Sequence, residues 1–337
     1  MVKLIVGVLT YNLEKYVGQA LDSILAQKTN FDFKIIVVDD FSTDKTRTIL
    51  QKYALQYPEK IEVILKEKNE GCLAASNVLF SYVKSPYFAF LDGDDFWLDE
   101  NHLQNGVDFL EKNIDYSMYG NNTYLYIDNK FQNKIVHKSK VNNTFELLDF
   151  FKEECPFVHT SAIVYRNAIF KEGVPKSFID NVTTPFNSVF RGEDYRFLLL
   201  LMNGKIYISD NLVSAYRIHS QGIWTSSSNF KRNYEMLLFR YYLYANFPMY
   251  KDQIELMFLK SYNKFMHFLI DDNDLINKFN FTKKEFDDLS FLLSLIHKDN
   301  SINWNKAKCA SPKNIKYKIY IWLYRKLYKK LTSKRYI

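Results

Sequence analysis

Cysteine and long apolar runs are both scarce in this sequence of 337 residues. The three cysteines, Cys72, Cys155 and Cys309, are odd in number and far apart, which excludes a disulfide framework and a zinc-ligand pair. No apolar run reaches the roughly 18 residues that a membrane-spanning helix needs, so we expect no spanning segment. The first residues also lack the apolar core and cleavage site of a secretory signal, which predicts a cytosolic protein.

Two common phosphate-binding loops are missing as well. No G-x-G-x-x-G loop follows the first apolar run, and G-x-x-x-x-G-K-[ST] does not occur anywhere. Their absence excludes the dinucleotide-binding and P-loop classes. If phosphates bind to this chain, groups other than a glycine-rich backbone must neutralise them.

Positive charge is concentrated at the C-terminal end, although the net charge is +7. Residues 311–337 hold nine Lys and Arg and no acid, whereas residues 1–310 hold 36 basic and 38 acidic residues. Nucleic-acid binders usually carry a basic face on the folded domain, so we expect no nucleic-acid partner. Over 313–331 apolar residues recur every four positions among basic ones, which predicts an amphipathic helix. That helix would either bind an anionic membrane surface or pack on the domain with its lysines in solvent.

Apolar runs rich in β-branched residues alternate with helical patterns over the first hundred residues. This alternation predicts an α/β fold with a mostly parallel central sheet flanked by helices. From about residue 230 onward the pattern is helical. We therefore expect a catalytic domain of residues 1–225 and a helical extension of residues 226–337. The predicted strands are 3–9, 34–38, 61–65 and 87–91, with helices at 21–25, 44–57 and 72–83 between them.

Polar side chains follow the predicted strands where each one ends. Because the carboxyl ends of parallel strands meet at one edge, where ligands bind, these residues predict a site. Asp92 and Asp94, two residues apart around Gly93, can converge on a divalent cation that also binds phosphate oxygens. Asp95 should diverge and either hold the loop or cap the next helix. The residues are Thr10 after the first strand, Asp39 and Asp40 after the second, and Asp92, Asp94 and Asp95 after the fourth.

Several motifs, in order, resemble those of the inverting glycosyltransferases of family 2, which have the nucleotide-diphospho-sugar (GT-A) fold. The resemblance is strong over residues 3–112, looser from 155 to 225 and absent beyond. The motifs are IVGVLTYNLEKYVGQALDSILAQ at 5–27, VVDDFSTDKT at 37–46, NEGCLAASN at 69–77, FLDGDDFWLDENHL at 90–103, GED at 192–194 and YRIHSQGIWT at 216–225.

The resemblance implies roles for the residues at these positions. Asp40 would accept a hydrogen bond from the nucleotide base, Thr10 would line the same pocket, and Asp39 would contact the ribose or base. The nucleotide site would be shaped by Asn69, Gly71 and Asn77. The metal, Mn²⁺ or Mg²⁺, would be held on the diphosphate by Asp94, with Asp92 at the ribose or sugar and His219 at the diphosphate or metal. A core histidine whose hydrogen bonds are satisfied within the fold is the alternative for His219.

Asp194 matches the catalytic base of this family. A carboxylate at the start of an apolar helix is also favoured by the helix dipole alone, so a capping acid is the alternative. Glu193 beside it could be the base instead, and the sequence leaves both open. The expected reaction moves a sugar from a nucleotide sugar, a UDP-sugar, to a hydroxyl of a glycan or lipid-linked saccharide. This would serve the synthesis of a bacterial surface polysaccharide, with the enzyme in the cytoplasm or on the inner face of its membrane.

Two other classes also place acids at strand ends. A phospho-accepting receiver domain would carry its acid pair after the first strand, whereas Asp39 and Asp40 follow the second. A sugar-1-phosphate nucleotidyltransferase would need a glycine-rich basic loop near its start, and the segment from Thr10 to Lys15 has neither glycine nor a basic cluster. Both remain alternatives to the transferase.

Overall fold

The computed structural model describes residues 2–220, 222, 227–271 and 283–303. The amphipathic segment predicted at 313–331 and Cys309 lie outside these residues. The chain divides into two compact units after residue 225. Among the helices described, none combines the length and apolarity needed to cross a membrane.

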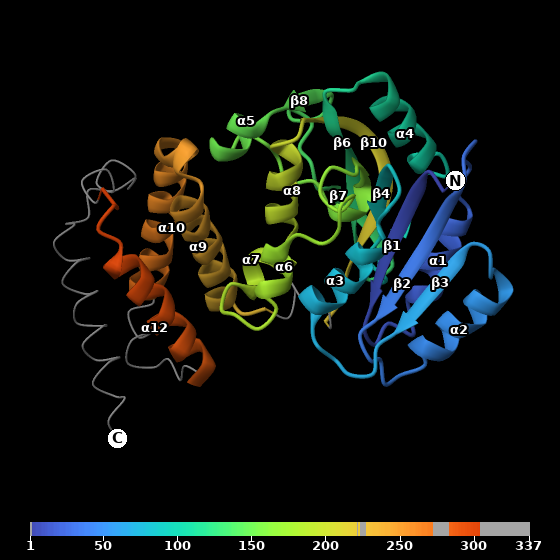
Figure 1. The fold of residues 1–337 in the computed structure, drawn as a ribbon, viewed down its shortest axis with the longest axis horizontal. Coiled ribbons are helices and arrows are strands. Elements are labelled where there is room, and N and C mark those ends of the chain that lie inside the picture. Colours follow the sequence, from blue (N-terminus) through green and yellow to red (C-terminus); the bar gives the residue numbers. More distant parts are fainter. Residues whose placement is uncertain (1, 221, 223–226, 272–282, 304–337) are drawn as a thin grey trace. The chain divides into compact units, whose positions relative to one another are not determined.

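One ten-stranded sheet dominates the first unit (Figure 1). The order of its main strands, with β7 and β8 added at β6 and β10, is β3 (Ile61–Leu65), β2 (Phe33–Asp39), β1 (Leu4–Thr10), β4 (Tyr87–Phe90), β9 (Ile163–Arg166), β6 (Tyr116–Ile127), β10 (Lys205–Ile218) and β5 (Phe96–Trp97). The two added strands are β7 (Lys130–Lys134) and β8 (Asn143–Phe145).

The strand directions determine which residues share an edge of this sheet. β1 runs parallel to β2 and β4, β2 runs parallel to β3, and β6 runs parallel to β10. β9 is antiparallel to both β4 and β6, so β6 points the same way as β4. The carboxyl ends of β1 to β4, β6 and β10 therefore meet at one edge, together with the amino end of β9. The predicted α/β class with a mostly parallel central sheet is confirmed.

Helices connect the strands of the first unit. Their bounds are α1 (Val17–Leu25), α2 (Thr46–Gln56), α3 (Cys72–Tyr82), α4 (His102–Lys112), α5 (Leu147–Phe151), α6 (Lys176–Asp180), α7 (Asn187–Arg191) and α8 (Glu193–Leu201). A short 3₁₀ turn, Thr160–Ala162, precedes β9.

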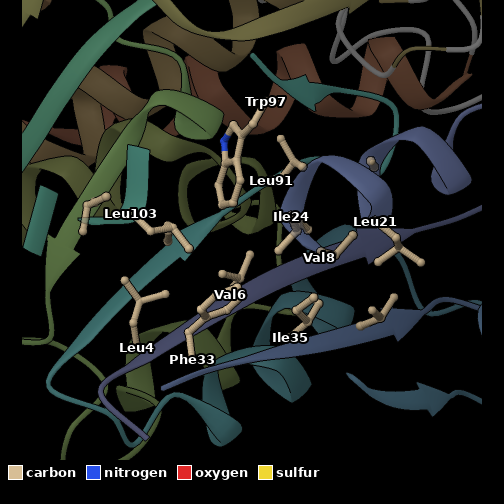
Figure 2. Close-up of a cluster of buried hydrophobic side chains, with 14 of the residues drawn as sticks. Leu4, Val6, Val8, Leu21, Ile24, Phe33, Ile35, Leu91, Trp97 and Leu103 are labelled. Atoms are coloured by element: carbon tan, nitrogen blue, oxygen red, sulfur yellow. The ribbon is translucent and has the colours of Figure 1, made fainter. Parts of the chain in front are cut away.

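The core beside β1 explains why its neighbouring helix packs where it does. Val8 of β1 and Ile35 of β2 belong to one buried cluster with Leu21 and Ile24 of α1 (Figure 2). All four side chains are fully buried. Burial of each such side chain contributes about 1.5 to 3 kcal/mol, which fixes the polar ends of β1 and β2 in place.

Three described helices make up the second unit: α9 (Asn229–Asn246), α10 (Lys251–Asp271) and α12 (Lys283–Lys298). Ser228 caps α9 by accepting a hydrogen bond from the Lys231 amide. Tyr244 of α9 stacks on Phe258 of α10 with ring centroids 5.5 Å apart. Within residues 227–271 and 283–303, the helical pattern expected from about residue 230 is confirmed.

Candidate active site

Asp39 ends β2 with its carboxylate fully engaged by the chain itself. It is completely buried. Oδ1 accepts from the Ser42 amide at 2.9 Å and from Arg47 Nε at 2.7 Å, while Oδ2 accepts from Thr10 Oγ1 at 3.0 Å and from the Ser42 hydroxyl. A carboxylate has about four lone-pair sites, and all of them are used here. This arrangement favours a bracing role between the ends of β1 and β2 over the expected ribose or base contact.

Asp40 keeps one acceptor site free of these internal bonds. Oδ1 accepts from Lys66 Nζ at 2.5 Å and from the Glu70 amide at 3.1 Å, and Oδ2 accepts from the Gly71 amide at 2.8 Å. Three of its roughly four lone-pair sites are occupied, which leaves one on Oδ2 for a ligand donor. The structure thus brings Asp40 and Gly71 together, as the motifs predicted.

The two asparagines expected at the nucleotide site lie in different surroundings. Asn69 is exposed beside Asp40, and its Oδ1 accepts from the Gly71 amide at 3.1 Å. Gly71 has φ 87°, a value that favours glycine, and it begins α3. Asn77 lies one and a half turns along α3 and donates to the Phe178 carbonyl of α6 at 3.0 Å. Its Oδ1 is buried and has no partner among the described residues.

Two exposed aromatic side chains at the same edge were missed by the sequence analysis. Tyr11 follows β1 and Phe41 follows Asp40, with 48% and 39% of their surfaces exposed. Phe41 has φ 68°, a strained value for a bulky residue, and the Arg47 guanidinium lies 5.0 Å from its ring centroid. An aromatic face at this place can stack on a nucleobase. The sequence does indicate Phe41, because this aromatic residue directly follows Asp39 and Asp40 at the end of a predicted strand. The high overall aromatic content led us to discount it.

The acidic loop after β4 is held close to the end of β1. Its turn is closed by the Asp95 amide, which donates to the Asp92 carbonyl at 2.9 Å. A Cβ atom at Gly93 would lie 2.8 Å from the Leu9 carbonyl oxygen and 2.9 Å from Thr10 Cγ2. Glycine is therefore required for the loop to approach β1 this closely.

Asp95 holds this loop to the rest of the sheet, as expected from its position. Its Oδ2 accepts from Ser161 Oγ at 2.9 Å, and its Oδ1 accepts from the Arg217 amide at 2.9 Å. Burial, followed by the charges of Asp94 and Asp92, raises the pKa of Asp95 well above its usual value. Asp95 is thus a structural acid at the centre of the site.

Asp94 and His219 form a close pair. Nε2 of His219 lies 2.8 Å from Oδ2 of Asp94. Arg217 supports the pair, since its Nε donates to the Asp94 carbonyl at 2.8 Å. The Tyr16 ring lies 4.8 Å from the His219 ring and 4.8 Å from the Arg217 guanidinium carbon. The residues predicted to hold the diphosphate and metal are therefore adjacent in the fold.

Asp92 faces a second set of potential ligands. One donor atom from each of Asp92, His159 and Glu193 lies within 4.8 Å of the other two. Burial raises the pKa of Asp92 most, the negative charges of Asp94 and Glu193 raise it further, and Arg196 lowers it. Several carboxylates crowded in a buried place favour a bound cation.

His159 is a site residue that the sequence analysis did not find. The Ser161 amide donates to its Nδ1 at 3.3 Å, and its ring stacks on Tyr216 with centroids 4.4 Å apart. Burial lowers the pKa of His159 to about 4, so the ring is neutral. Nδ1 also lies 3.6 Å from Asp95 Oδ2, so Nε2 is the ring nitrogen that has no hydrogen bond with the described residues.

Glu193 and Asp194 begin α8 and differ in exposure. Glu193 accepts hydrogen bonds from the side chain and backbone of Thr160, and its Oε2 is buried without a partner in the described part of the chain. Burial raises the pKa of Glu193 to about 7 despite the opposing effects of Arg196 and Thr160. Asp194 is exposed at the next position. Glu193 thus faces Asp92, whereas Asp194 is open to solvent.

The donors at this edge fit a hard divalent cation. Carboxylate oxygens with an imidazole nitrogen suit Mn²⁺ and Mg²⁺. Adjacent ligands on an octahedral ion with bonds of about 2.1 Å lie about 3 Å apart, close to the separation of Asp94 Oδ2 and His219 Nε2. Glu193 Oε2, buried without a described partner, is a further atom that a ligand or ion would satisfy.

Comparison with known families agrees with this arrangement. Residues 5–174, half of the chain, match the family Glycosyl transferase family 2. The chain belongs to this family. The predicted family and enzyme class are confirmed, and the receiver domain and the nucleotidyltransferase are set aside.

Relatives of the glycosyltransferase resemble it over different lengths. An uncharacterized protein of Mycobacterium tuberculosis is 25% identical over 226 residues, which are 67% of this chain and 62% of that protein. The chain thus spans about three fifths of the length of that relative. The teichoic acid poly(glycerol phosphate) polymerase of Staphylococcus epidermidis is 39% identical over 95 residues, 28% of this chain and 13% of the polymerase.

A solved structure shares the fold of the glycosyltransferase. S. aureus TarS 1-349 in complex with UDP-GlcNAc matches with a TM-score of 0.63 at 20% identity, over 98% of this chain and 92% of that one. This likeness confirms the GT-A type of fold that the motifs predicted.

Proposed function

We propose that this glycosyltransferase moves a sugar from a UDP-sugar to a hydroxyl group of a glycan or lipid-linked saccharide, with inversion and with a divalent metal. The acceptor belongs to a bacterial surface polysaccharide. The observation that supports this most is the single edge on which Asp40, Asp92, Asp94 and His219 lie. UDP-GlcNAc in the TarS structure and the teichoic acid function in the name of the S. epidermidis polymerase support the donor and the pathway class.

The nucleotide is bound at the ends of β1 and β2. The open site on Asp40 Oδ2 accepts an N–H of the base, and Phe41 and Tyr11 offer ring faces for stacking. Thr10, Asn69 and Gly71 shape this part of the site, while Asp39 acts by bracing Thr10 and Arg47. Asn77 contributes by fixing α3 to α6.

The diphosphate and metal are bound at the loop after β4. Asp94 and His219 would hold the ion, with Asp92 directed to the ribose or the sugar. When bound, Mn²⁺ or Mg²⁺ neutralises the charge that builds on the departing diphosphate, as a Lewis acid. His159 keeps its neutral ring against Tyr216 rather than binding the ion.

Asp194 is the catalytic base of the transfer. An acceptor arrives from solvent, and Asp194 is exposed, whereas Glu193 is turned toward Asp92 and Thr160. The acceptor oxygen bonds to the anomeric carbon, the bond from that carbon to the diphosphate oxygen breaks, UDP leaves and the hydroxyl proton passes to Asp194. A positioned base of this kind contributes about 10²- to 10⁴-fold to the rate. Inversion in one displacement needs no enzyme nucleophile.

The second unit and the C-terminal tail complete the proposal. Residues 1–225 are the catalytic domain, and residues 226–337 are a helical extension. The basic segment 311–337 holds the enzyme on the anionic inner face of the cytoplasmic membrane. We expect the full-length chain to pellet with anionic liposomes at low salt. High salt and deletion of residues 311–337 should each abolish this pelleting. Pelleting by the deleted chain would contradict this part.

Donor hydrolysis is the direct test of the proposed function. The chain is incubated with UDP-GlcNAc, UDP-glucose, UDP-galactose and GDP-mannose in the presence of Mn²⁺, and the released nucleotide is measured. We expect release from a UDP-sugar, loss of release in EDTA and recovery on adding Mn²⁺ or Mg²⁺. Release from none of the donors would contradict the transferase, and release unaffected by EDTA would contradict the metal.

A further inference from the structure

β6 and β7 form a hairpin whose turn lies at the edge of the sheet that carries the acidic loop. Asp128 and Asn129 have φ values of 49° and 60°, so the two-residue turn is of the type that matches the twist of paired strands. Ile127 pairs with Lys130, and Tyr126 pairs with Phe131. The turn follows the carboxyl end of β6, so it lies at the same edge of the sheet as the acidic loop.

Three aromatic residues of this hairpin cluster around Phe131, with ring planes tilted by 49° and 56° against it. We call this cluster the aromatic platform: Tyr124, Tyr126 and Phe131. The Phe131 ring lies 5.3 Å from that of Tyr124 and 5.0 Å from that of Tyr126. Phe131 is 50% exposed, and the two tyrosines are partly exposed. Scattered exposed apolar residues are common, but three rings in mutual contact, each at least partly exposed, indicate a binding surface.

The aromatic platform is connected to the catalytic loop through one side chain. The Arg217 guanidinium carbon lies 5.0 Å from the Tyr126 ring, and Arg217 Nε donates to the Asp94 carbonyl. Phe96 also packs against Tyr126, with centroids 5.2 Å apart. Tyr126 is thus held by the same residue that supports the Asp94 and His219 pair, and it in turn contacts Phe131.

We propose that the aromatic platform is an acceptor subsite that stacks on the apolar C–H face of a pyranose ring in the acceptor glycan. This inference rests on the proposed function and names where its acceptor binds. A pyranose presents axial C–H groups on one face and hydroxyl groups around its rim, which suits an open aromatic ring. The platform binds a saccharide a short distance from the acidic loop, so that a neighbouring hydroxyl reaches the donor sugar.

The test measures saccharide binding by the full-length protein with saturation-transfer NMR. The probes are chitohexaose, cellohexaose and maltohexaose, each with UDP and Mn²⁺ present. We expect at least one to bind, with the strongest saturation on axial C–H protons and little change in affinity with salt. Phe131→Ala should weaken that binding about tenfold, whereas Phe131→Trp should preserve it.

Matched controls separate this inference from the proposed function. Tyr82 is 38% exposed at the C-terminal end of α3, which is followed by the amino end of β4. That end of the helix therefore lies at the opposite edge of the sheet from the acidic loop, and Tyr82→Ala should bind the saccharide as the wild type does. UDP affinity and donor hydrolysis should be unchanged in Phe131→Ala. Absence of binding by every probe, or equal binding by wild type and Phe131→Ala, would overturn the subsite. If the wild type hydrolyses no donor, the result would instead contradict the proposed transferase function.

The same experiment also detects whether the hairpin binds an anionic ligand through its lysines instead of stacking on a sugar ring. Lys130 and Lys134 flank Phe131 on β7. If binding falls steeply with salt and is lost in Lys130→Ala but not in Phe131→Ala, the hairpin attracts an anionic ligand and stacking is excluded. Binding of phosphatidylglycerol vesicles in place of the saccharides would likewise overturn the proposal.

Discussion

Nε2 of His219 and Oδ2 of Asp94 lie 2.8 Å apart although 125 residues separate them in the sequence. Asp94 follows β4, and His219 follows the last residue of β10, so the pair joins the two halves of the first unit. The two atoms either share a proton or bind one ion together. The second arrangement is the one that the proposed function needs.

Replacement of His219 tests which histidine binds the metal. We expect His219→Ala to weaken Mn²⁺ binding at least about tenfold, since it removes a ligand from the Asp94 pair. His159→Ala should leave Mn²⁺ affinity nearly unchanged, because the Ser161 amide occupies Nδ1 of His159. Electron paramagnetic resonance of free Mn²⁺ during titration measures both without an activity assay. Weaker binding in His159→Ala alone would assign the ion to Asp92, His159 and Glu193.

Substitution at the start of α8 tests the identity of the base. Asp194→Asn should lower sugar transfer by about 10²- to 10⁴-fold while UDP affinity stays the same. Glu193→Gln should cost far less, since glutamine retains an oxygen that accepts from Thr160. Transfer is measured by product formation, and UDP affinity by calorimetry. The reverse order of losses would make Glu193 the base.

Substitutions of Phe41 should affect the free energy of unfolding and the affinity for UDP differently. Phe41→Gly relieves the left-handed backbone, so we expect it to be more stable than Phe41→Ala by about 1 kcal/mol. Both variants lack the ring, and both should lose UDP affinity about tenfold through lost stacking. Urea unfolding and UDP titration provide the two measurements. Wild-type UDP affinity in either variant would show that the ring does not contact the base.

His102 makes the stability of the first unit depend on pH. It is fully buried at the start of α4, and burial lowers its pKa to about 3. Below its unfolded pKa of about 6.5, the unfolded chain binds a proton that the folded chain does not, so stability falls as the pH falls from about 6.5 toward 3. The expected loss from this group is up to about 1.4 kcal/mol per pH unit.

The variant His102→Gln should remove that contribution. Urea unfolding at several values between pH 6.5 and pH 4 should show a shallower decline for His102→Gln than for the wild type. His137 is exposed, and His137→Gln should follow the wild-type slope. Equal slopes for all three proteins would exclude His102 as the source.

The first half of the fold could be predicted from the sequence because its strands are buried on both faces. The strand at 61–65 is β3 with the same bounds, and the predicted edge collects Thr10, Asp39 and Asp92. β7 was not predicted, since all five of its residues are exposed and carry no apolar alternation. Its signal was the turn at Asp128 and Asn129, which favours positive φ values.

His159 could not be found by the strand-end rule for a physical reason. The rule considers residues that follow parallel strands. Because β9 is antiparallel to its neighbours, the residues that precede it, His159 among them, lie at that edge instead. The full length of β10, Lys205–Ile218, also could not be predicted, because its pairing with β6 shifts register along the way. One shift lies at the polar residues Ser209 and Asp210, where the apolar pattern of the strand is interrupted. The pattern alone therefore predicts a strand that ends there.

Gly93 determines how closely the acidic loop approaches the end of β1. No atom larger than hydrogen fits between its Cα and the backbone of Leu9. Any side chain at this position would therefore push Asp92 and Asp94 away from Thr10. Under the proposed function, this one glycine sets the length of the nucleotide sugar that can reach both the end of β1 and the acidic loop.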